Sequence, residues 1–166
     1  MTRKITITAL FVALAMVLSY VEALIPFNFG IPGVKLGLAN LVVVTALYVL
    51  DAKTAFAVSV IRIILISVTF GNIAALVYSL AGGILSYFVM LAISRIKGFS
   101  PVGVSVAGGV SHNLGQLIAA MLVIESLSLS YYLPVLMIAG VITGLLIGLV
   151  AKPVIAAMSE YMGREK

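Results

Sequence analysis

Six apolar stretches follow one another along the chain, and only short connections separate them. Within each stretch, apolar residues occupy both odd and even positions, whereas barrel strands alternate apolar and polar residues. A membrane-spanning helix needs about 20 mostly apolar residues, and most of the stretches approach that length. The pattern therefore predicts an all-α membrane protein, a bundle of six transmembrane helices that forms a single domain over residues 1–166. The stretches are 5–25, 36–50, 54–70, 73–94, 102–124 and 131–151.

The composition supports a membrane protein. Hydrophobic residues make up 63% of the 166 residues and charged residues only 9%, whereas a soluble domain carries about 25% charged residues. A soluble fold of this composition would leave much apolar surface with nothing to cover it. Because little chain remains between the stretches, there is no room for a soluble catalytic domain.

Lysine and arginine are distributed unevenly between the two sides of the predicted bundle. With the amino terminus in the cytoplasm, Lys35 lies outside, Arg62 lies within a stretch, and the others of the ten basic residues lie inside. This asymmetry follows the positive-inside rule and explains the net charge of +5 without any nucleic-acid partner. It predicts a multi-pass protein of the cell membrane with both termini in the cytoplasm.

A polar stripe runs along the stretch 102–124. At 100° per residue, His112, Asn113 and Gln116 fall on one side together with Ser105 and Gly109, and the opposite side is apolar. Such residues can hold helices together by hydrogen bonds of about 0.6 kcal/mol each. They can equally offer donors and acceptors to a ligand in mid-membrane. We take His112, Asn113 and Gln116 as candidate substrate-binding residues.

Arg62 is the only basic residue deep within an apolar stretch. An arginine at mid-bilayer costs about 2.5–3.5 kcal/mol on insertion scales, so it needs a partner. Glu22, near the outer end of the first stretch, is a possible one. Arg62 is therefore either half of an internal ion pair or cap, or the cation of an anion site, and we include both residues in the candidate site.

The connection 26–35 is the longest on the outer side. Its sequence, PFNFGIPGVK, contains two prolines and two glycines, which rule out a continuing helix. A loop over a bundle is a natural lid or ligand wall. Lys35, Asn40 and Asn72 stand near the same surface, and we add them to the candidate substrate-binding residues of a pocket that opens outward.

Small residues recur at helical spacing in two places. Gly140, Gly144 and Gly148 form a four-residue ridge on the last stretch, and Ala9 and Ala13 form a similar surface on the first. Small residues let the backbones of two membrane helices approach closely. Packing inside the bundle explains both surfaces, and the first helix is also well placed to meet another subunit.

Several chemistries lack the residues that they need. The chain has no cysteine and one histidine, so no metal site is expected. Asp51 is the only aspartate, whereas diphosphate chemistry with magnesium uses several converging carboxylates. No phosphate-binding Gly-x-x-x-x-Gly-Lys-Ser/Thr loop is present. The sequence therefore predicts a protein without catalysis, cofactor or metal of its own.

Four segments resemble one bacterial membrane family. They are IPGVKLGLAN (31–40), FGN (70–72), YSLAGG (78–83) and HNLGQ (112–116), and they resemble the Gx transporter family, also labelled heptaprenyl diphosphate synthase component I. That family is similar to the substrate-binding S components of energy-coupling factor (ECF) transporters. The resemblance implies six helices with cytoplasmic termini and a ligand near the outer face, under the loop after the first helix. It also implies that an Ala-x-x-x-Ala surface, here Ala9 and Ala13, docks on a transmembrane coupling subunit with its ATPases.

The function expected from this resemblance is uptake of a small, anionic or polar molecule by a substrate-binding membrane subunit. Partner ATPases would supply the energy. The alternative is an accessory membrane subunit in isoprenoid or quinone synthesis, or in flavin-linked electron transfer. With one aspartate, the chain cannot supply the aspartate-rich motifs of prenyl-chain elongation, so the synthase label fits at most an accessory role.

Overall fold

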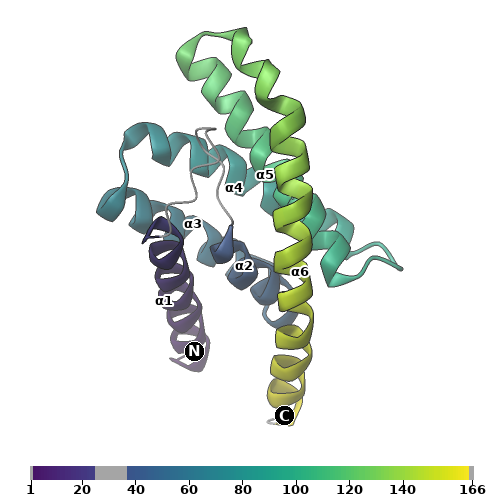
Figure 1. The fold of residues 1–166 in the computed structure, drawn as a ribbon. Coiled ribbons are helices and arrows are strands. Elements are labelled where there is room, and N and C mark those ends of the chain that lie inside the picture. The colour runs from purple at the N-terminus through teal and green to yellow at the C-terminus, as the bar shows by residue number, and fades with distance from the viewer. Residues whose placement is uncertain (1, 25–36, 165–166) are drawn as a thin grey trace.

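The computed structural model describes residues 2–24 and 37–164, and this part of the chain is a bundle of helices (Figure 1). Each predicted stretch forms one α-helix, so the all-helical architecture and the six segments are confirmed. Residues Leu127–Tyr132 add a short 3-10 helix, η1, between the last two. The α-helices are α1 (Thr2–Leu24), α2 (Leu38–Val49), α3 (Ala52–Phe70), α4 (Ile73–Ser94), α5 (Pro101–Ile124) and α6 (Leu133–Arg164).

Polar residues in the connections begin three of the helices. The side chain of Asp51 accepts a hydrogen bond from the Thr54 backbone N–H at 2.9 Å, and Ser100 caps α5 before Pro101. Such caps satisfy backbone N–H groups that have no partner within the helix. Asn72 does the same for α4, accepting from the Ala75 N–H at 2.8 Å. The polar connections therefore define where successive apolar helices begin.

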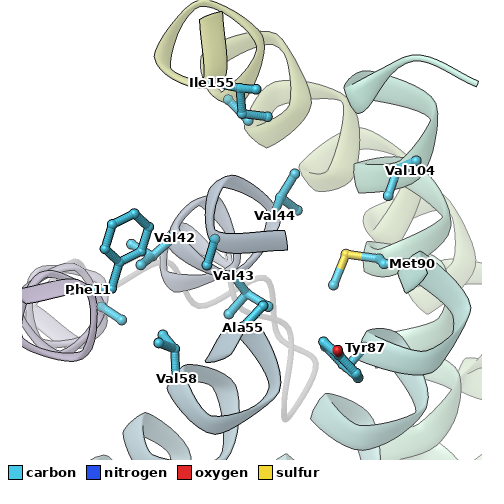
Figure 2. Close-up of a cluster of buried hydrophobic side chains, with 13 residues drawn as sticks. Phe11, Val42, Val43, Val44, Ala55, Val58, Tyr87, Met90, Val104 and Ile155 are labelled. Carbon is cyan, nitrogen blue, oxygen red and sulfur yellow. The ribbon is translucent and has the colours of Figure 1, made fainter. Parts of the chain in front are cut away.

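The short helix α2 forms the centre of the bundle. It has 12 residues, which gives a length of about 18 Å, less than the roughly 30 Å of hydrocarbon. Its residues from Val42 to Ala46 are all buried, so other helices cover every side of it. Figure 2 shows Val42, Val43 and Val44 between Phe11 of α1 and Met90 of α4. Thus α2 serves as the core around which the longer helices pack.

Glycines bring α5 into close contact with α6. A Cβ atom on Gly140 would lie 2.9 Å from the Val110 Cα atom, and one on Gly148 would lie 2.6 Å from the Val102 Cα atom. Gly144 makes the same kind of approach between them. The predicted glycine ridge is therefore an internal packing surface, along which the two backbones approach more closely than side chains would allow.

Helix α6 is longer than the sequence predicts. The apolar stretch ends at residue 151, but the helix continues through Pro153 to Arg164, 32 residues in all. At 1.5 Å per residue this is about 48 Å, well beyond the thickness of the hydrocarbon. Ile155 is buried in the core cluster and Met158 packs against it. These contacts hold the extension beside the bundle, and neither hydropathy nor the proline at 153 predicts them.

The outer surface of the bundle is apolar. Val68, Ile73 and Leu122 are each more than 70% exposed, which is unfavourable in water but suits contact with lipid. Among the described residues, five helices are long and apolar enough to cross a membrane. Figure 1 places both termini at the same end of the molecule. The chain is thus a multi-pass membrane protein.

Cysteine accessibility provides a test of the predicted orientation. Because the chain has no native cysteine, single cysteines can be introduced at exposed positions. We expect Ser128→Cys to react in intact cells with an impermeant thiol reagent, and Lys53→Cys and Lys97→Cys to react only after lysis. Asn28→Cys should behave like Ser128→Cys, although residue 28 lies outside the described part of the chain. The opposite labelling pattern would place the termini outside.

Candidate functional site

Arg62 and Asn40 form a polar pair inside the bundle. Arg62 lies on α3 and is only partly exposed, and its Nη2 atom donates to the Asn40 Oδ1 atom of α2 at 3.1 Å. The Nε atom of Arg62 is buried and has no hydrogen-bond partner among the described residues. Buried donors are nearly always paired in proteins. The guanidinium is therefore held in place with part of its binding capacity unused.

Glu22 supplies a negative charge that acts on Arg62. Its carboxylate on α1 attracts the Arg62 guanidinium electrostatically. Its Oε1 atom also accepts a hydrogen bond from the Gly37 backbone N–H at 2.6 Å. Gly37 begins α2 with a φ of 73°, a left-handed conformation that glycine adopts without strain. The structure therefore brings together three of the predicted site residues, Glu22, Asn40 and Arg62, which come from three different helices.

Of the other predicted residues near the outer surface, Asn72 does not join this group. Asn72 is exposed, and its side chain caps α4, which is a structural task. Lys35 lies outside the described residues, as does the predicted lid segment 26–35.

His112 and Gln116 lie together on α5, where α5 packs against α4. A Cβ atom on Gly82 would lie 2.7 Å from the Gln116 Cγ atom and 3.2 Å from the His112 Cε1 atom. The next residue of α4, Gly83, instead faces Ile63, the neighbour of Arg62 on α3. At this level α4 therefore lies between α3 and α5 (Figure 1). The structure separates His112 and Gln116 from Arg62 and does not gather them into one described cavity.

Asn113 has yet another partner. It is buried, and its Nδ2 atom donates to the Leu136 backbone oxygen of α6 at 2.8 Å. This is an interhelical hydrogen bond, one of the two explanations that the sequence left open for the polar stripe. The stripe faces the interior, but its residues have different neighbours. His112 and Gln116 contact α4, whereas Asn113 bonds to α6.

A narrow crevice between α2, α4, α5 and α6 contains polar residues that the site prediction omitted. It has room for about one water molecule, far less than the roughly 300–1,000 Å³ of a pocket for a drug-sized ligand. Asn40 lines it and also accepts the hydrogen bond from Arg62. Ser105 falls on the predicted polar stripe, but only its contact with α6 reveals it as a lining residue. The lining residues are Asn40, Val44, Met90, Ser105, Gly108, Gly109, Thr143, Gly144 and Ile147.

The proposed docking residues lie on the surface of the bundle. Ala9 and Ala13 are both exposed on α1, whereas Phe11 and Ala15 are buried. Packing within the bundle, the default explanation for small residues, therefore does not account for Ala9 and Ala13. Their surface is open to lipid or to another membrane helix.

Within residues 2–24 and 37–164, no three histidine, cysteine, aspartate or glutamate side chains are grouped so as to hold a metal ion. The polar features described above offer hydrogen bonds and one positive charge in a mostly apolar setting. Such groups can bind and orient a molecule.

The fold defines a helical, multi-pass membrane protein, with the polar pair of Arg62 and Asn40 between its helices. The chain matches the family model described as heptaprenyl diphosphate synthase component I over residues 11–154, and it belongs to that family. The family resemblance drawn from the sequence motifs is thereby confirmed. Comparisons with curated proteins and with solved structures find no match.

Proposed function

We propose that the protein is a substrate-binding subunit for the uptake of a small anionic or polar molecule, similar to the S components of ECF transporters. It would have no catalysis of its own, and partner ATPases would energise transport. The observation that carries this proposal is Arg62, a cation within a membrane helix whose Nε atom is buried without a hydrogen-bond partner among the described residues.

The electrostatics of Arg62 favour an anion as the bound group. A charge inside a membrane bundle is costly and usually marks a functional site. In a medium of low dielectric constant, its attraction for an opposite charge is stronger than in water. The hydrogen bond from Arg62 to Asn40 fixes the direction of the guanidinium, so less conformational freedom is lost on binding.

Glu22 provides a counter-charge when no ligand is bound. It attracts Arg62, but one of its carboxylate oxygens already accepts from the Gly37 N–H. A ligand carboxylate or phosphate can therefore engage the guanidinium directly without removing Glu22 from its backbone partner. This arrangement allows Arg62 to remain compensated in both the empty and the occupied state.

A second candidate function follows from the description of the family. An accessory membrane subunit of isoprenoid or quinone synthesis would match the family's name, and flavin-linked electron transfer is a related possibility. Magnesium-dependent diphosphate chemistry needs several carboxylates, but the chain contains one aspartate. In this case a partner enzyme would carry the chemistry.

Gentle purification of the tagged protein from its native membrane tests both functions, with mass spectrometry of the accompanying proteins. We expect a transmembrane coupling subunit and ATPases to accompany the protein. We also expect Ala9→Leu combined with Ala13→Leu to reduce their recovery about tenfold or more, because bulky side chains prevent close helix approach. Binding of small anions should be largely unchanged in this variant.

The matched control is Ala74→Leu, which enlarges an exposed alanine on α4 and should leave recovery unchanged. A prenyl or redox enzyme in place of the ATPases would support the second function. Normal recovery of the coupling subunit with the α1 double variant would show that Ala9 and Ala13 are not the docking surface.

A further inference from the structure

The first turn of α2 holds both charged residues of the site. The Glu22 Oε1 atom accepts from the Gly37 backbone N–H at 2.6 Å, and the Arg62 Nη2 atom donates to the Asn40 Oδ1 atom at 3.1 Å. Gly37 and Asn40 are joined in turn, because the Asn40 backbone N–H donates to the Gly37 oxygen at 2.7 Å. This turn therefore fixes the positions of a carboxylate from α1 and a guanidinium from α3 near each other.

The two charged groups attract each other but form no ion pair in the described structure. Glu22 acts on Arg62 through its charge, yet each side chain bonds to a residue of α2 instead. The Arg62 Nε atom is buried without a hydrogen-bond partner among the described residues. Both side chains are partly exposed. The site therefore presents a positive and a negative group that are close but separate.

The overall charge of the site indicates what it can bind. Glu22 is the one charged group among the described residues that acts on Arg62, so the empty pair is neutral. An anion bound to Arg62 would leave an excess negative charge beside Glu22. An unbalanced charge is costly in a medium of low dielectric constant. A molecule with one group of each sign keeps the site neutral and gives both side chains a partner.

We propose that the substrate is a small zwitterion, whose carboxylate binds Arg62 and whose ammonium group binds Glu22. This inference rests on the proposed function and specifies its substrate class, a small amino acid. The guanidinium can donate to a carboxylate while it still donates to Asn40, since it has five N–H donors. Glu22 uses one oxygen for Gly37, and a carboxylate has a second oxygen that can accept from an ammonium group.

Matched pairs of carboxylates, with and without an amino group, test this inference on the purified full-length protein. Suitable pairs are acetate with free glycine, propanoate with 3-aminopropanoate, and butanoate with 4-aminobutanoate. Their dissociation constants can be measured by titration calorimetry in mild detergent near neutral pH. We expect the amino member of at least one pair to bind about tenfold more tightly or more, the effect of a charge-assisted hydrogen bond. The chain length with the largest preference reports how far apart the two charged groups are.

Replacement of Glu22 assigns that preference to its charge. Glu22→Gln removes the charge but keeps an oxygen that can accept from Gly37. This variant should lose the preference for the amino member and bind the plain carboxylate at least as tightly as the wild-type protein, because a repulsive charge is gone. A purely structural role of Glu22 would instead weaken both members alike.

Two further variants serve as controls. Glu22→Asp keeps the charge on a shorter side chain, so the preference should persist and shift toward the longer amino acids. Glu125→Gln removes an exposed carboxylate at the end of α5, and it should keep the wild-type preference.

The possible outcomes separate this inference from the proposed function. If the two members of every pair bind equally, or if the preference survives in Glu22→Gln, no ammonium group binds at Glu22 and the inference is overturned. The anion site remains supported in that case, provided that binding of the plain carboxylates depends on Arg62. If no carboxylate of the panel binds the wild-type protein, with or without an amino group, both the anion site and this inference are overturned.

Discussion

Replacement of Arg62 by glutamine is expected to weaken binding of small anions by a hundredfold or more while the protein still folds. The substitution keeps a polar side chain of similar length but removes the only positive charge within the described part of the site. Removing one partner of a buried ion pair costs about 3–5 kcal/mol, which corresponds to a factor of about 10² to 10⁴ in affinity. The measurement is anion binding to the purified protein, alongside its melting temperature.

Two further variants show whether a loss of anion binding comes from the missing charge or from a disturbed fold. Arg62→Lys keeps the charge but has no planar guanidinium with which to engage Asn40 and an anion together, so we expect an intermediate loss. Gln116→Leu, on the other side of α4, removes a neutral polar group and should cost less, roughly 1–3 kcal/mol if its amide contacts the ligand. Full anion binding by a folded Arg62→Gln protein would eliminate the anion site.

Replacement of Gly144 by valine is expected to prevent formation of the native bundle. A Cβ atom there would lie 2.6 Å from the Val106 Cα atom and 2.7 Å from the Ser105 backbone oxygen. Both neighbours are backbone atoms of α5, so relief of the clash requires movement of a whole helix. Overpacking of this kind costs 1–3 kcal/mol when side chains can adjust and more when they cannot. We expect little monodisperse protein in mild detergent and a strongly lowered melting temperature.

Gly163→Ala is the matched control for this prediction. A Cβ atom at residue 163 would meet no heavy atom within 4 Å, and alanine favours a helix over glycine by about 1 kcal/mol. This variant should be as stable as the wild-type protein or slightly more so. A Gly144→Val protein with wild-type yield and melting temperature would show that α5 and α6 do not approach as closely as described.

The positions of the helices follow largely from the local sequence. Each apolar stretch forms a helix, and Asp51 and Asn72 cap the helices that follow them. Hydropathy can predict this because the bilayer acts on each segment separately and requires its backbone groups to bond within a helix. The same property also explains the error at α6. Its end depends on the burial of Ile155 against other helices, and hydropathy contains no information about such contacts.

The partners of the site residues, by contrast, were decided by tertiary structure. The sequence identified Arg62 as a charge within an apolar stretch, since the cost of inserting such a group can be estimated residue by residue, and it placed Glu22 and Asn40 near the outer surface. It could not show that Arg62 donates to Asn40, 22 positions away. That contact depends on how α2 enters the centre of the bundle.

For the polar stripe of α5, the sequence determined which residues face inward, because helical periodicity alone sets the angles between them. It did not determine what lies opposite each one. His112 and Gln116 meet Gly82 of α4, and Asn113 bonds to Leu136 of α6. Glycines on α4 and α6 let these helices approach α5 from two sides. His112 and Asn113 are only about 100° apart on α5, yet one contacts α4 and the other bonds to α6. Only the packing of the bundle determines these partners.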